Sequence, residues 1–434
     1  MQERVVVIGG GIAGIQASLD LASRGFKVYL VEKSPSIGGR MAQLDKTFPT
    51  MDCSMCILAP KMIECTHHPN VQLLTYSELM KINGSVGNFK VKILKKPRYV
   101  DETKCTGCGI CAENCPPEAP NEFDENLGTR KAIYMPFPQA VPRVMVIDKD
   151  DCIECGLCEK VCQANAINRK QQPEEIELDV GAIVVATGFD MFDPSVIPQY
   201  GYGRFKNVIT AMELERLLCA SGPTGGHLIR PSDGKIPRSI AFIQCIGSRD
   251  RREWINHSYC SSICCKYAVK DAVLIKEHEP ATSVKIFYID MRAFGKGFQE
   301  FVNRARSEFG IEFIRSNPGE ISEDPSTNNL IIWFEDPITR TVQHMPFDLV
   351  VLCPALIPRK GVEELAKTLG IELDNYGFFK SVDVLKTPLD TAVPGIFACG
   401  YCLGPKTGDI PDSITQASAT AARVAEVLAG KEAS

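Results

Sequence analysis

The chain has 434 residues, of which 44% are hydrophobic and 23% charged, and its formal net charge is -5. This length suffices for two or three domains with separate cores, and the composition is that of an ordinary globular protein. A mildly acidic balance without blocks of like charge argues against nucleic acid as a partner.

Signals for export and for direct membrane insertion are both missing from the sequence. An apolar strand begins at Val5, with no charged leader, apolar core and cleavage site before it. No uninterrupted apolar run approaches the roughly 20 residues needed to cross a bilayer. We therefore expect a cytoplasmic protein, linked to a membrane only through partners. In a reducing compartment, metal ligation explains nineteen cysteines better than disulfides do.

Residues 5–33 predict a dinucleotide-binding unit made of a strand, a helix and a second strand. Gly9, Gly11 and Gly14 directly follow the first strand, and Glu32 closes the second about 20 residues later. Glycine permits a tight turn and close backbone approach to a pyrophosphate at the helix N-terminus. The carboxylate of Glu32 can accept a hydrogen bond from the ribose hydroxyls.

Three later segments favour FAD as the dinucleotide. Gly38-Gly39-Arg40 follows the acidic strand, and residues 184–188 and 395–400 each predict a strand that ends at a glycine. The predicted FAD contacts are Gly9, Gly11, Gly14, Glu32, Gly39, Arg40, Ala186, Thr187, Gly188, Gly400, Gln416 and Ala417. This set, in this order, resembles the two-dinucleotide-domain flavoproteins of the glutathione and thioredoxin reductase kind. The resemblance implies a late helix whose positive N-terminal end stabilises a reduced, anionic flavin.

Two matched cysteine runs lie in an insert at residues 98–170, between linker-like segments. Each run has the spacing C-x-x-C-x-x-C-x-x-x-C, the bacterial ferredoxin signature, in which the fourth cysteine ligates the other cluster. The predicted ligands are Cys105, Cys108, Cys111 and Cys162 for one four-iron (4Fe-4S) cluster, and Cys115, Cys152, Cys155 and Cys158 for the second. Zinc is the alternative for such pairs, but two complete runs favour iron and sulfide. Gln163 stands where a proline is expected after the second run.

A second dinucleotide-binding domain is expected after the insert, without its nucleotide. The strand at residues 238–249 ends in Gln244-Cys-Ile-Gly-Ser248, which lacks two of the three expected glycines. Side chains there would hinder backbone approach to a pyrophosphate, so nicotinamide binding is disfavoured. The alternating pattern nevertheless continues, and it predicts a strand at 284–289, a helix at 297–309, a hairpin strand at 330–334 and a strand at 349–353.

Four further cysteines gather at this degenerate turn. Cys245 lies on the turn, and Cys260, Cys264 and Cys265 follow. One helical turn separates Cys260 from Cys264, so we expect them on one helix face, with Cys265 offset by about 100°. A third four-iron cluster could replace the nicotinamide here, but spacing alone leaves buried apolar cysteines equally open.

Several motifs together carry a more specific resemblance. They are Asp52-Cys-Ser-Met-Cys-Ile-Leu-Ala-Pro-Lys61, the insert with residues 123–132, Gln244 to Arg249, the pair Cys264-Cys265, and Gly404-Pro-Lys406 with Asp409-Ile-Pro-Asp412. Over nearly its whole length, the chain resembles the A-type, flavin-bearing subunits of the heterodisulfide reductases of methanogens and related anaerobes. That resemblance implies that Cys245, Cys260, Cys264 and Cys265 ligate a cluster close to FAD. The implied cofactors are FAD and three four-iron clusters.

The resemblance also implies a function and partners. We expect an FAD and iron-sulfur oxidoreductase subunit that bifurcates or confurcates electrons between a two-electron donor, ferredoxin and a disulfide. Its expected partners in an oligomeric complex are B- and C-type subunits, a hydrogenase or dehydrogenase donor subunit, and ferredoxin. Full-length relatives carry extra N- and C-terminal cluster domains, so we expect a short form. Because it is similar to the A-type subunits of quinone-interacting complexes, a non-bifurcating wiring subunit is the alternative.

The predicted fold class is α/β, a two-dinucleotide-domain flavoprotein with an inserted α+β two-cluster ferredoxin domain. The predicted parts are an FAD-binding domain in three pieces (1–97, 171–233 and 356–434), the ferredoxin domain (98–170) and a degenerate NAD(P)H-type domain (234–355) that carries the third cluster.

Some residues keep two interpretations. Lys270 and Glu215 are candidates to tune the flavin potential by charge, but each could equally be a solvated surface residue. Cys53, Cys56 and Cys65 could be cluster ligands or a redox pair, and we favour structural or flavin-adjacent thiols. Cys399 and Cys402 have redox-pair spacing, and we favour a packing role.

Overall fold

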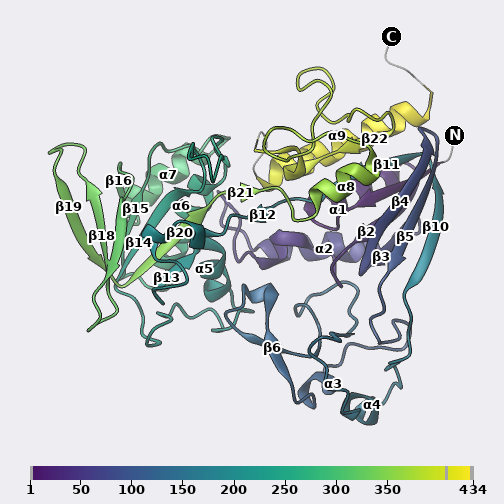
Figure 1. Ribbon diagram of the computed structural model, residues 1–434, viewed down its shortest axis with the longest axis horizontal. Coiled ribbons are helices and arrows are strands. Elements are labelled where there is room, and N and C mark those ends of the chain that lie inside the picture. The colour runs from purple at the N-terminus through teal and green to yellow at the C-terminus, as the bar shows by residue number, and fades with distance from the viewer. Residues whose placement is uncertain (1–2, 406–408, 431–434) are drawn as a thin grey trace. The chain divides into compact units, whose positions relative to one another are not determined.

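The computed structural model describes residues 3–405 and 409–430, so Lys406 of the Gly404-Pro-Lys406 motif lies outside the described residues. The chain forms two compact units. Unit 1 is built from Met1–Ala42, Met55–Phe189 and Pro358–Ser434, and unit 2 from Gln43–Ser54 and Asp190–Ile357. Each unit has a sheet and a core of its own (Figure 1).

A five-stranded parallel sheet forms the centre of unit 1. Its strands, in spatial order, are β22 (Ile396–Ala398), β11 (Ala182–Val185), β1 (Arg4–Ile8), β2 (Lys27–Glu32) and β3 (Val71–Thr75). Side chains alternate between the two faces of a strand. Val5 and Val7 therefore pack in the core on one face, while Val6 and Ile8 pack in the core on the other. Burial on both faces explains the continuous apolar run in β1.

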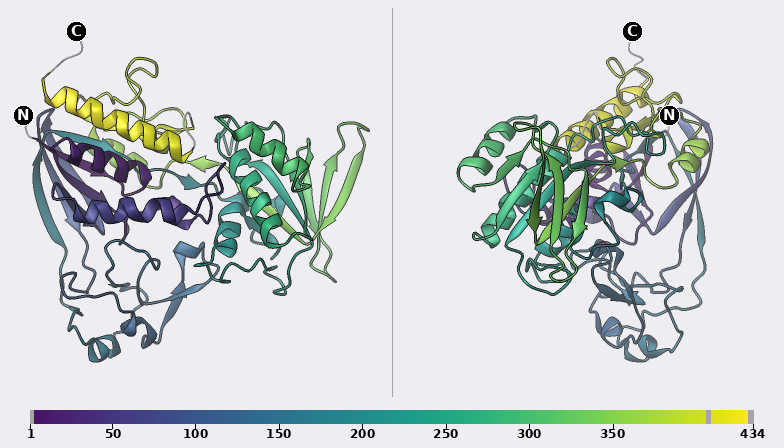
Figure 2. Two further views of the ribbon diagram at one scale, coloured as in Figure 1. Left: turned by 180° about the vertical axis from the view of Figure 1, so that it is seen from behind. Right: turned by 60° about the vertical axis from the view of Figure 1, so that its left-hand side comes forward.

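Helices cover one face of this sheet and a second sheet covers the other. The core on the helical side contains residues of α1 (Ile12–Ser23), α2 (Ser54–His67) and α9 (Ile410–Leu428), which run close together in Figure 2. The antiparallel sheet on the other side is β10 (Glu174–Val180), β5 (Asn88–Lys95) and β4 (Ser77–Ser85), with α8 (Val362–Leu369) beside it.

The cysteine-rich insert leaves unit 1 between two paired strands. Lys95 at the end of β5 pairs with Glu174 at the start of β10, so the two ends of the insert lie side by side. Insertions are tolerated at such points because the parent fold is not stretched. Buried Arg98 fixes the root, donating hydrogen bonds to Pro35 O, Thr75 Oγ1 and Glu102 Oε1.

The insert itself consists of short elements around a small core. Its helices are α3 (Ile110–Glu113) and α4 (Leu157–Val161), and its strands are β6 (Glu118–Pro120), β7 (Thr129–Lys131), β8 (Ile133–Tyr134) and β9 (Val146–Ile147). Gly109 and Gly156 precede α3 and α4 in the same left-handed conformation. Cys111 and Cys158 are buried in the two helices, so the predicted internal repeat is also a structural repeat.

Unit 2 repeats the parallel sheet on a smaller scale. Its strands are β13 (Val208–Thr210), β20 (Leu349–Pro354), β14 (Ser239–Ile246), β15 (Ser283–Phe287) and β16 (Glu312–Ile314), joined by α5 (Ala211–Leu218), α6 (Cys264–His278) and α7 (Phe298–Ser307). An antiparallel sheet of β17 (Glu320–Glu323), β18 (Leu330–Glu335) and β19 (Val342–Phe347) continues its core, and β12 (Asp190–Met191) pairs with β21 (Leu356–Ile357).

The predicted elements of this second unit are confirmed, while its first residue differs from the prediction. The expected strands and helix correspond to β15, β18, β20 and α7. The predicted domain begins at residue 234, whereas the unit begins at Asp190. The reason is that β13 pairs in parallel with β20, which draws the preceding segment into the sheet.

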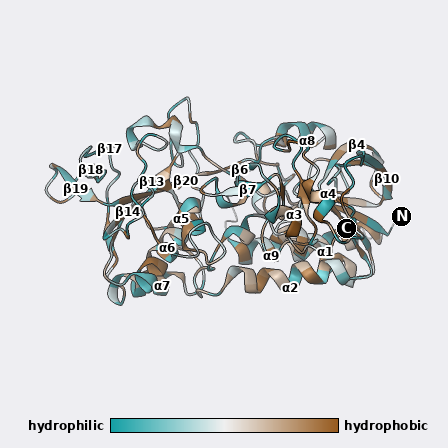
Figure 3. Cartoon of the chain, turned by 90° about the horizontal axis from the view of Figure 1, so that it is seen from below, coloured by the Kyte–Doolittle hydropathy of each residue, from teal (hydrophilic) through white to brown (hydrophobic). Residues whose placement is uncertain are grey.

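The helices of both units carry mixed hydropathy, as α2 and α7 show in Figure 3. Within residues 3–405 and 409–430, no helix combines the length and the apolar character that a membrane crossing requires.

Candidate functional site

The predicted FAD contacts in unit 1 converge around the turn between β1 and α1. A Cβ built on Gly14 would lie 1.8 Å from Gly9 O, and one on Gly9 would lie 2.4 Å from Ala186 O. These are backbone contacts, so both positions require glycine for packing alone. Gly400 approaches the same turn, because its Cβ would lie 3.0 Å from the Cβ of Ala13.

Gly11 differs from its neighbours, because the protein itself leaves room for a side chain there. The nearest heavy atom to a Cβ at Gly11 would be Gly39 Cα at 4.0 Å, and its φ of -78° suits any residue. Gly11 caps α1 without a side-chain hydrogen bond. The first N–H groups of the helix are therefore available to an anionic ligand. This exposed backbone fits the pyrophosphate of a dinucleotide.

Glu32 is held beside this turn. Its carboxylate accepts hydrogen bonds from Gly10 N at 2.6 Å and from Ser34 N at 2.7 Å. A carboxylate has further lone pairs, so Glu32 can still accept from a ribose hydroxyl. The strand thus ends with a fixed acceptor, as the sequence predicts.

The remaining FAD candidates lie on neighbouring segments. Gly400 N donates to Gln416 Oε1 at 2.7 Å, which ties the end of β22 to α9. Arg40 pairs with Glu125 of the insert at 2.8 Å. Thr187 and Gly188 follow β11 directly, and Ala417 is buried in the helix-side core. Their contact with FAD stays a prediction.

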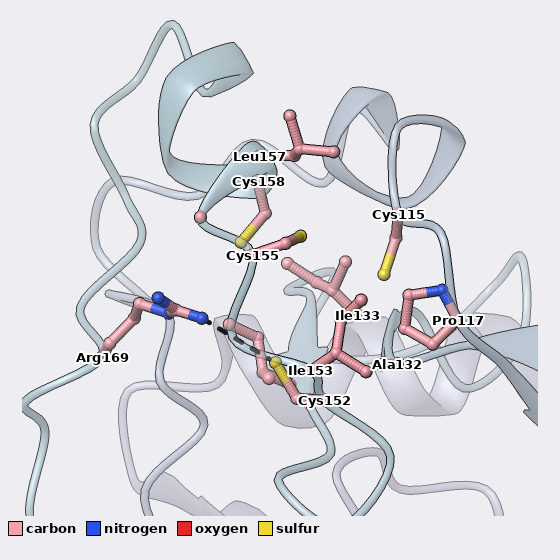
Figure 4. A pocket seen from close by; sticks show the side chains of 12 residues that line it. Cys115, Pro117, Ala132, Ile133, Cys152, Ile153, Cys155, Leu157, Cys158 and Arg169 are labelled. Carbon is pink, nitrogen blue, oxygen red and sulfur yellow. Dashed lines mark hydrogen bonds between the residues drawn. The ribbon is translucent and has the colours of Figure 1, made fainter.

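The insert brings together four of the predicted cluster ligands. A cavity with an empty volume of about 310 Å³ is lined by Cys115, Cys152, Cys155 and Cys158, together with Arg169 and apolar side chains. We call these four cysteines the second ferredoxin set. Figure 4 shows their side chains around one space. Cys115 comes from the first run and the other three from the second, which fits the exchange of fourth ligands in two-cluster ferredoxins.

Cys105, Cys108, Cys111 and Cys162 form the first ferredoxin set. Burial raises the pKa of Cys111 to about 12, and the nearby thiols of Cys105 and Cys108 add to this rise. Burial also raises the pKa of Cys158 in the second set, but there the positive charge of Arg169 opposes the rise. The two sets therefore differ in their electrostatic surroundings.

The degenerate turn of unit 2 is strained and filled. Cys245 has φ +63°, a left-handed conformation that costs a residue with a side chain about 1–3 kcal/mol. The register of β14 against β20 shifts between Ile243 and Ile246, so Cys245 lies at an irregularity of the strand. A Cβ at Gly247 would lie 2.4 Å from the ring of Phe192. An aromatic ring thus packs against this turn, where a dinucleotide would need space.

The third set, Cys245, Cys260, Cys264 and Cys265, gathers beside this turn. Burial raises the pKa of the Cys245 thiol to about 12, and neighbouring Cys265 and Cys260 raise it further. Cys264 and Cys265 begin α6, whose positive N-terminal end favours thiolates. Four cysteines at one place, two of them on a helix N-terminus, are a suitable donor set for a cluster.

The expected helical face shared by Cys260 and Cys264 is wrong. Helix α6 starts only at Cys264, and Cys260 lies in the preceding loop. Ser262 interrupts the helix because it adopts φ +63°. Cys260 therefore approaches the set from a loop, and Ser262 N donates to its sulfur at 3.4 Å.

Sequence reasoning missed Cys353 and Arg169. Cys353 is buried on β20, and its pKa is raised by burial and by nearby Cys264. Arg169 donates to Cys152 Sγ at 4.0 Å. A cation shortly after the second cysteine run was the available signal for Arg169, whereas nothing in the sequence links Cys353 to the third set. Within the described ranges, no three His, Cys, Asp or Glu side chains form a group that could hold a single metal ion.

Two family models match parts of the chain. One, described as FAD dependent oxidoreductase, matches residues 4–52, and the other, described as 4Fe-4S dicluster domain, matches residues 104–166. The matches coincide with the glycine turn of unit 1 and with the insert.

Curated relatives match nearly the whole chain. One of the A-type iron-sulfur subunits of the CoB--CoM heterodisulfide reductase of Methanopyrus kandleri is 58% identical over 99% of this chain and 65% of the relative. Its counterpart in the CoB--CoM heterodisulfide reductase of Methanocaldococcus jannaschii is 56% identical over 98% of this chain and 64% of the relative. The chain belongs to the family of heterodisulfide reductase A-type subunits. It spans 64–65% of the length of these two relatives.

Solved structures show the fold of this heterodisulfide reductase family member. Lactococcus lactis thioredoxin reductase has a TM-score of 0.54 and 17% identity, covering 98% of this chain and 99% of that one. T. acidophilum thioredoxin reductase has a TM-score of 0.53 and 14% identity, covering 97% and 96%. The predicted two-dinucleotide-domain fold with a ferredoxin insert is thereby confirmed.

Lys270 and Glu215 form a buried charged group in unit 2 of this family member. Lys270 contacts Glu215 and, at 2.6 Å, Asp271, and its side chain is only 2% exposed. Glu215 also accepts from Asp45 N at 3.1 Å. Burial raises the pKa of Asp271, while Lys270 opposes the rise. The surface interpretation of Lys270 and Glu215 is therefore wrong, and their role in tuning the flavin stays a prediction.

The other cysteines are free thiols with different surroundings. Cys65, Cys399 and Cys402 are buried, and Cys402 Sγ donates to Cys399 O at 3.1 Å and to Val185 O at 3.4 Å. Burial raises the pKa of Cys402 to about 12, so it is a poor nucleophile, as a packing role requires. Cys53 is partly exposed and Cys56 exposed.

We expect Gly11→Ala to remove FAD and leave the fold intact. The methyl group fits the protein but blocks backbone approach to the pyrophosphate, so the FAD content of the purified protein should fall about tenfold or more. Gly14→Ala is the contrasting variant, because its methyl group collides with Gly9 O and should lower the thermal stability itself. Gly11→Ala protein with full FAD content contradicts the assignment.

We expect Lys270→Met to destabilise unit 2 by about 3–5 kcal/mol, because it leaves Glu215 and Asp271 buried without their cation. Denaturant unfolding followed by tryptophan fluorescence reports on this unit, since Trp254 and Trp333 both belong to it.

Lys285→Met is the matched control for this experiment. Lys285 pairs with the exposed Glu312, and its loss should cost no more than about 1 kcal/mol. Equal effects of the two substitutions would show that the buried group is no more strongly coupled than a surface pair.

Proposed function

We propose that this chain transfers electrons through FAD and three four-iron clusters within a heterodisulfide reductase-like complex. The observation that carries the proposal is the cavity of the second ferredoxin set, where thiols from both cysteine runs line one space. Crossed ligands of this kind are characteristic of two-cluster ferredoxins. The third set supplies four more thiols, two of them at the N-terminus of α6.

The residues of this chain would hold and orient the cofactors. Gly11 exposes the helix N-terminus to the pyrophosphate, and Glu32 offers a fixed acceptor to the ribose. Phe192, packed against Gly247, keeps a second dinucleotide away from the degenerate turn. When bound, FAD exchanges electron pairs and iron-sulfur clusters exchange single electrons, so the protein supplies position and electrostatics.

We further propose electron bifurcation or confurcation between a two-electron donor, ferredoxin and a disulfide. Relatives support this by name: one from Methanothermobacter marburgensis belongs to an H(2):CoB-CoM heterodisulfide,ferredoxin reductase, and one from Methanococcus maripaludis carries H(2)/formate in place of H(2). Both names contain a disulfide, ferredoxin and a two-electron donor. Lys270 and Glu215 are our candidates for adjusting the flavin potential by charge.

The proposed partners follow from the same names. They are B- and C-type subunits, a hydrogenase or dehydrogenase donor subunit, and ferredoxin. We also propose a cytoplasmic location, supported by nineteen cysteines that are all free of disulfides.

We expect about twelve iron atoms per FAD in protein purified without oxygen, from three four-iron clusters. Cys260→Ala should lower this number by about four, because it removes one ligand of the third set from a loop. Cys353→Ala, in a buried thiol outside the proposed ligand set, should keep the iron. Iron, acid-labile sulfide and FAD analyses measure all three proteins, and full iron content in Cys260→Ala rejects the third cluster.

We expect the complex to reduce ferredoxin only while a disulfide is being reduced. The measurement follows ferredoxin and thiol formation in parallel, with hydrogen or another two-electron donor, in the presence and absence of the disulfide. Equal amounts of donor electrons should reach each acceptor when both are present. Ferredoxin reduction that is independent of the disulfide would favour the non-bifurcating wiring function.

A further inference from the structure

We propose that Arg169 raises the reduction potential of the cluster held by the second ferredoxin set above that of the cluster held by the first set. Arg169 would act through the ligand Cys152, so it is a positioning residue. The inference rests on the proposed function, because it assumes that both sets hold four-iron clusters.

The geometry places a guanidinium group against one thiol of the cavity. Arg169 Nη2 donates to Cys152 Sγ at 4.0 Å, and Nη1 donates to the backbone oxygen of Glu154 at 3.2 Å. Arg169 also lines the cavity itself. Figure 4 shows its side chain directed at Cys152. Two hydrogen bonds to the loop of Cys152 therefore fix the position of the charge.

A fixed cation at this place favours the reduced state. Adding one electron makes a cluster and its thiolates more negative, and cluster potentials depend on net charge, hydrogen bonds to sulfur and solvent exposure. Arg169 supplies both a positive charge and an N–H donor, and such charge-assisted hydrogen bonds are stronger than neutral ones. Cys155 is exposed, so water screens part of the effect.

The first ferredoxin set has a different partner. Its described hydrogen bond to sulfur runs from the neutral backbone amide Ala166 N to Cys162 Sγ at 3.3 Å. The internal repeat sharpens the contrast. Seven residues after the last cysteine, the second run has Arg169 where the first run has Glu122. Glu122 is engaged by Arg130 at 2.8 Å. The two halves of the insert thus diverge in charge at matching positions, and electrons should collect on the second set.

The test is a potentiometric titration of the complete, cofactor-loaded protein, monitored by electron paramagnetic resonance. In Arg169→Gln, the reduced fraction of one ferredoxin cluster at fixed potential should fall about tenfold, a shift of 59 mV for one electron. The other cluster should shift less. Arg169→Lys keeps the charge and should shift less than Arg169→Gln. Cys155→Ser alters the signal of its own cluster and thereby assigns the affected one.

Lys170→Gln is the matched control, because it removes the neighbouring exposed cation, which is not bonded to a ligand sulfur in the described residues. The proposal is overturned if Arg169→Gln shifts no further than Lys170→Gln, or if both ferredoxin clusters shift equally. If Arg169→Gln loses its cluster, Arg169→Lys decides, and an unchanged potential there rejects the proposal. Absence of four-iron signals from the unmodified protein would instead reject the proposed function.

Discussion

Close backbone contact at the first glycine turn is the constraint on which unit 1 depends. Gly14 lies against Gly9 O, and Gly9 lies against Ala186 O, so β1, α1 and β11 meet with no room for side chains. Gly38 N donates to Gly10 O at 2.7 Å, which brings the next loop to the same point. Because these contacts are made by the protein alone, Gly11 is the position where the need for glycine comes from the ligand.

The same fold is used differently in unit 2. Its turn carries Cys245 in a left-handed conformation and is covered by Phe192. A strained residue with a side chain persists only when its surroundings fix it, and such residues cluster at functional sites. Burial within a sheet of the same topology thus supports two sites of different chemistry: exposed amides for a phosphate in unit 1 and sulfur donors in unit 2.

Sequence patterns predicted the elements and the cofactor classes better than they predicted the surroundings of each site. Spacing identified the second ferredoxin set, because the ligands of a cluster occupy short, fixed intervals. It failed for Cys260, where Ser262 interrupts the helix, and for Lys270, whose burial depends on Glu215 and Asp271. Phe192 is distant from the cysteines in sequence. Contacts of this kind depend on tertiary packing, which a local pattern does not contain.

Charge compensation links the three cysteine sets. Four thiolates around one cluster carry a negative charge that a partly buried site must offset. In the second set Arg169 contributes this charge. In the third set the N-terminus of α6 contributes, and Arg292 and Arg249 oppose the burial that raises the pKa of Cys265 to about 11. Because compensation strengthens the reduced state, differences in compensating charge between the sets are differences in electron affinity, and the placement of cations sets the direction of electron flow.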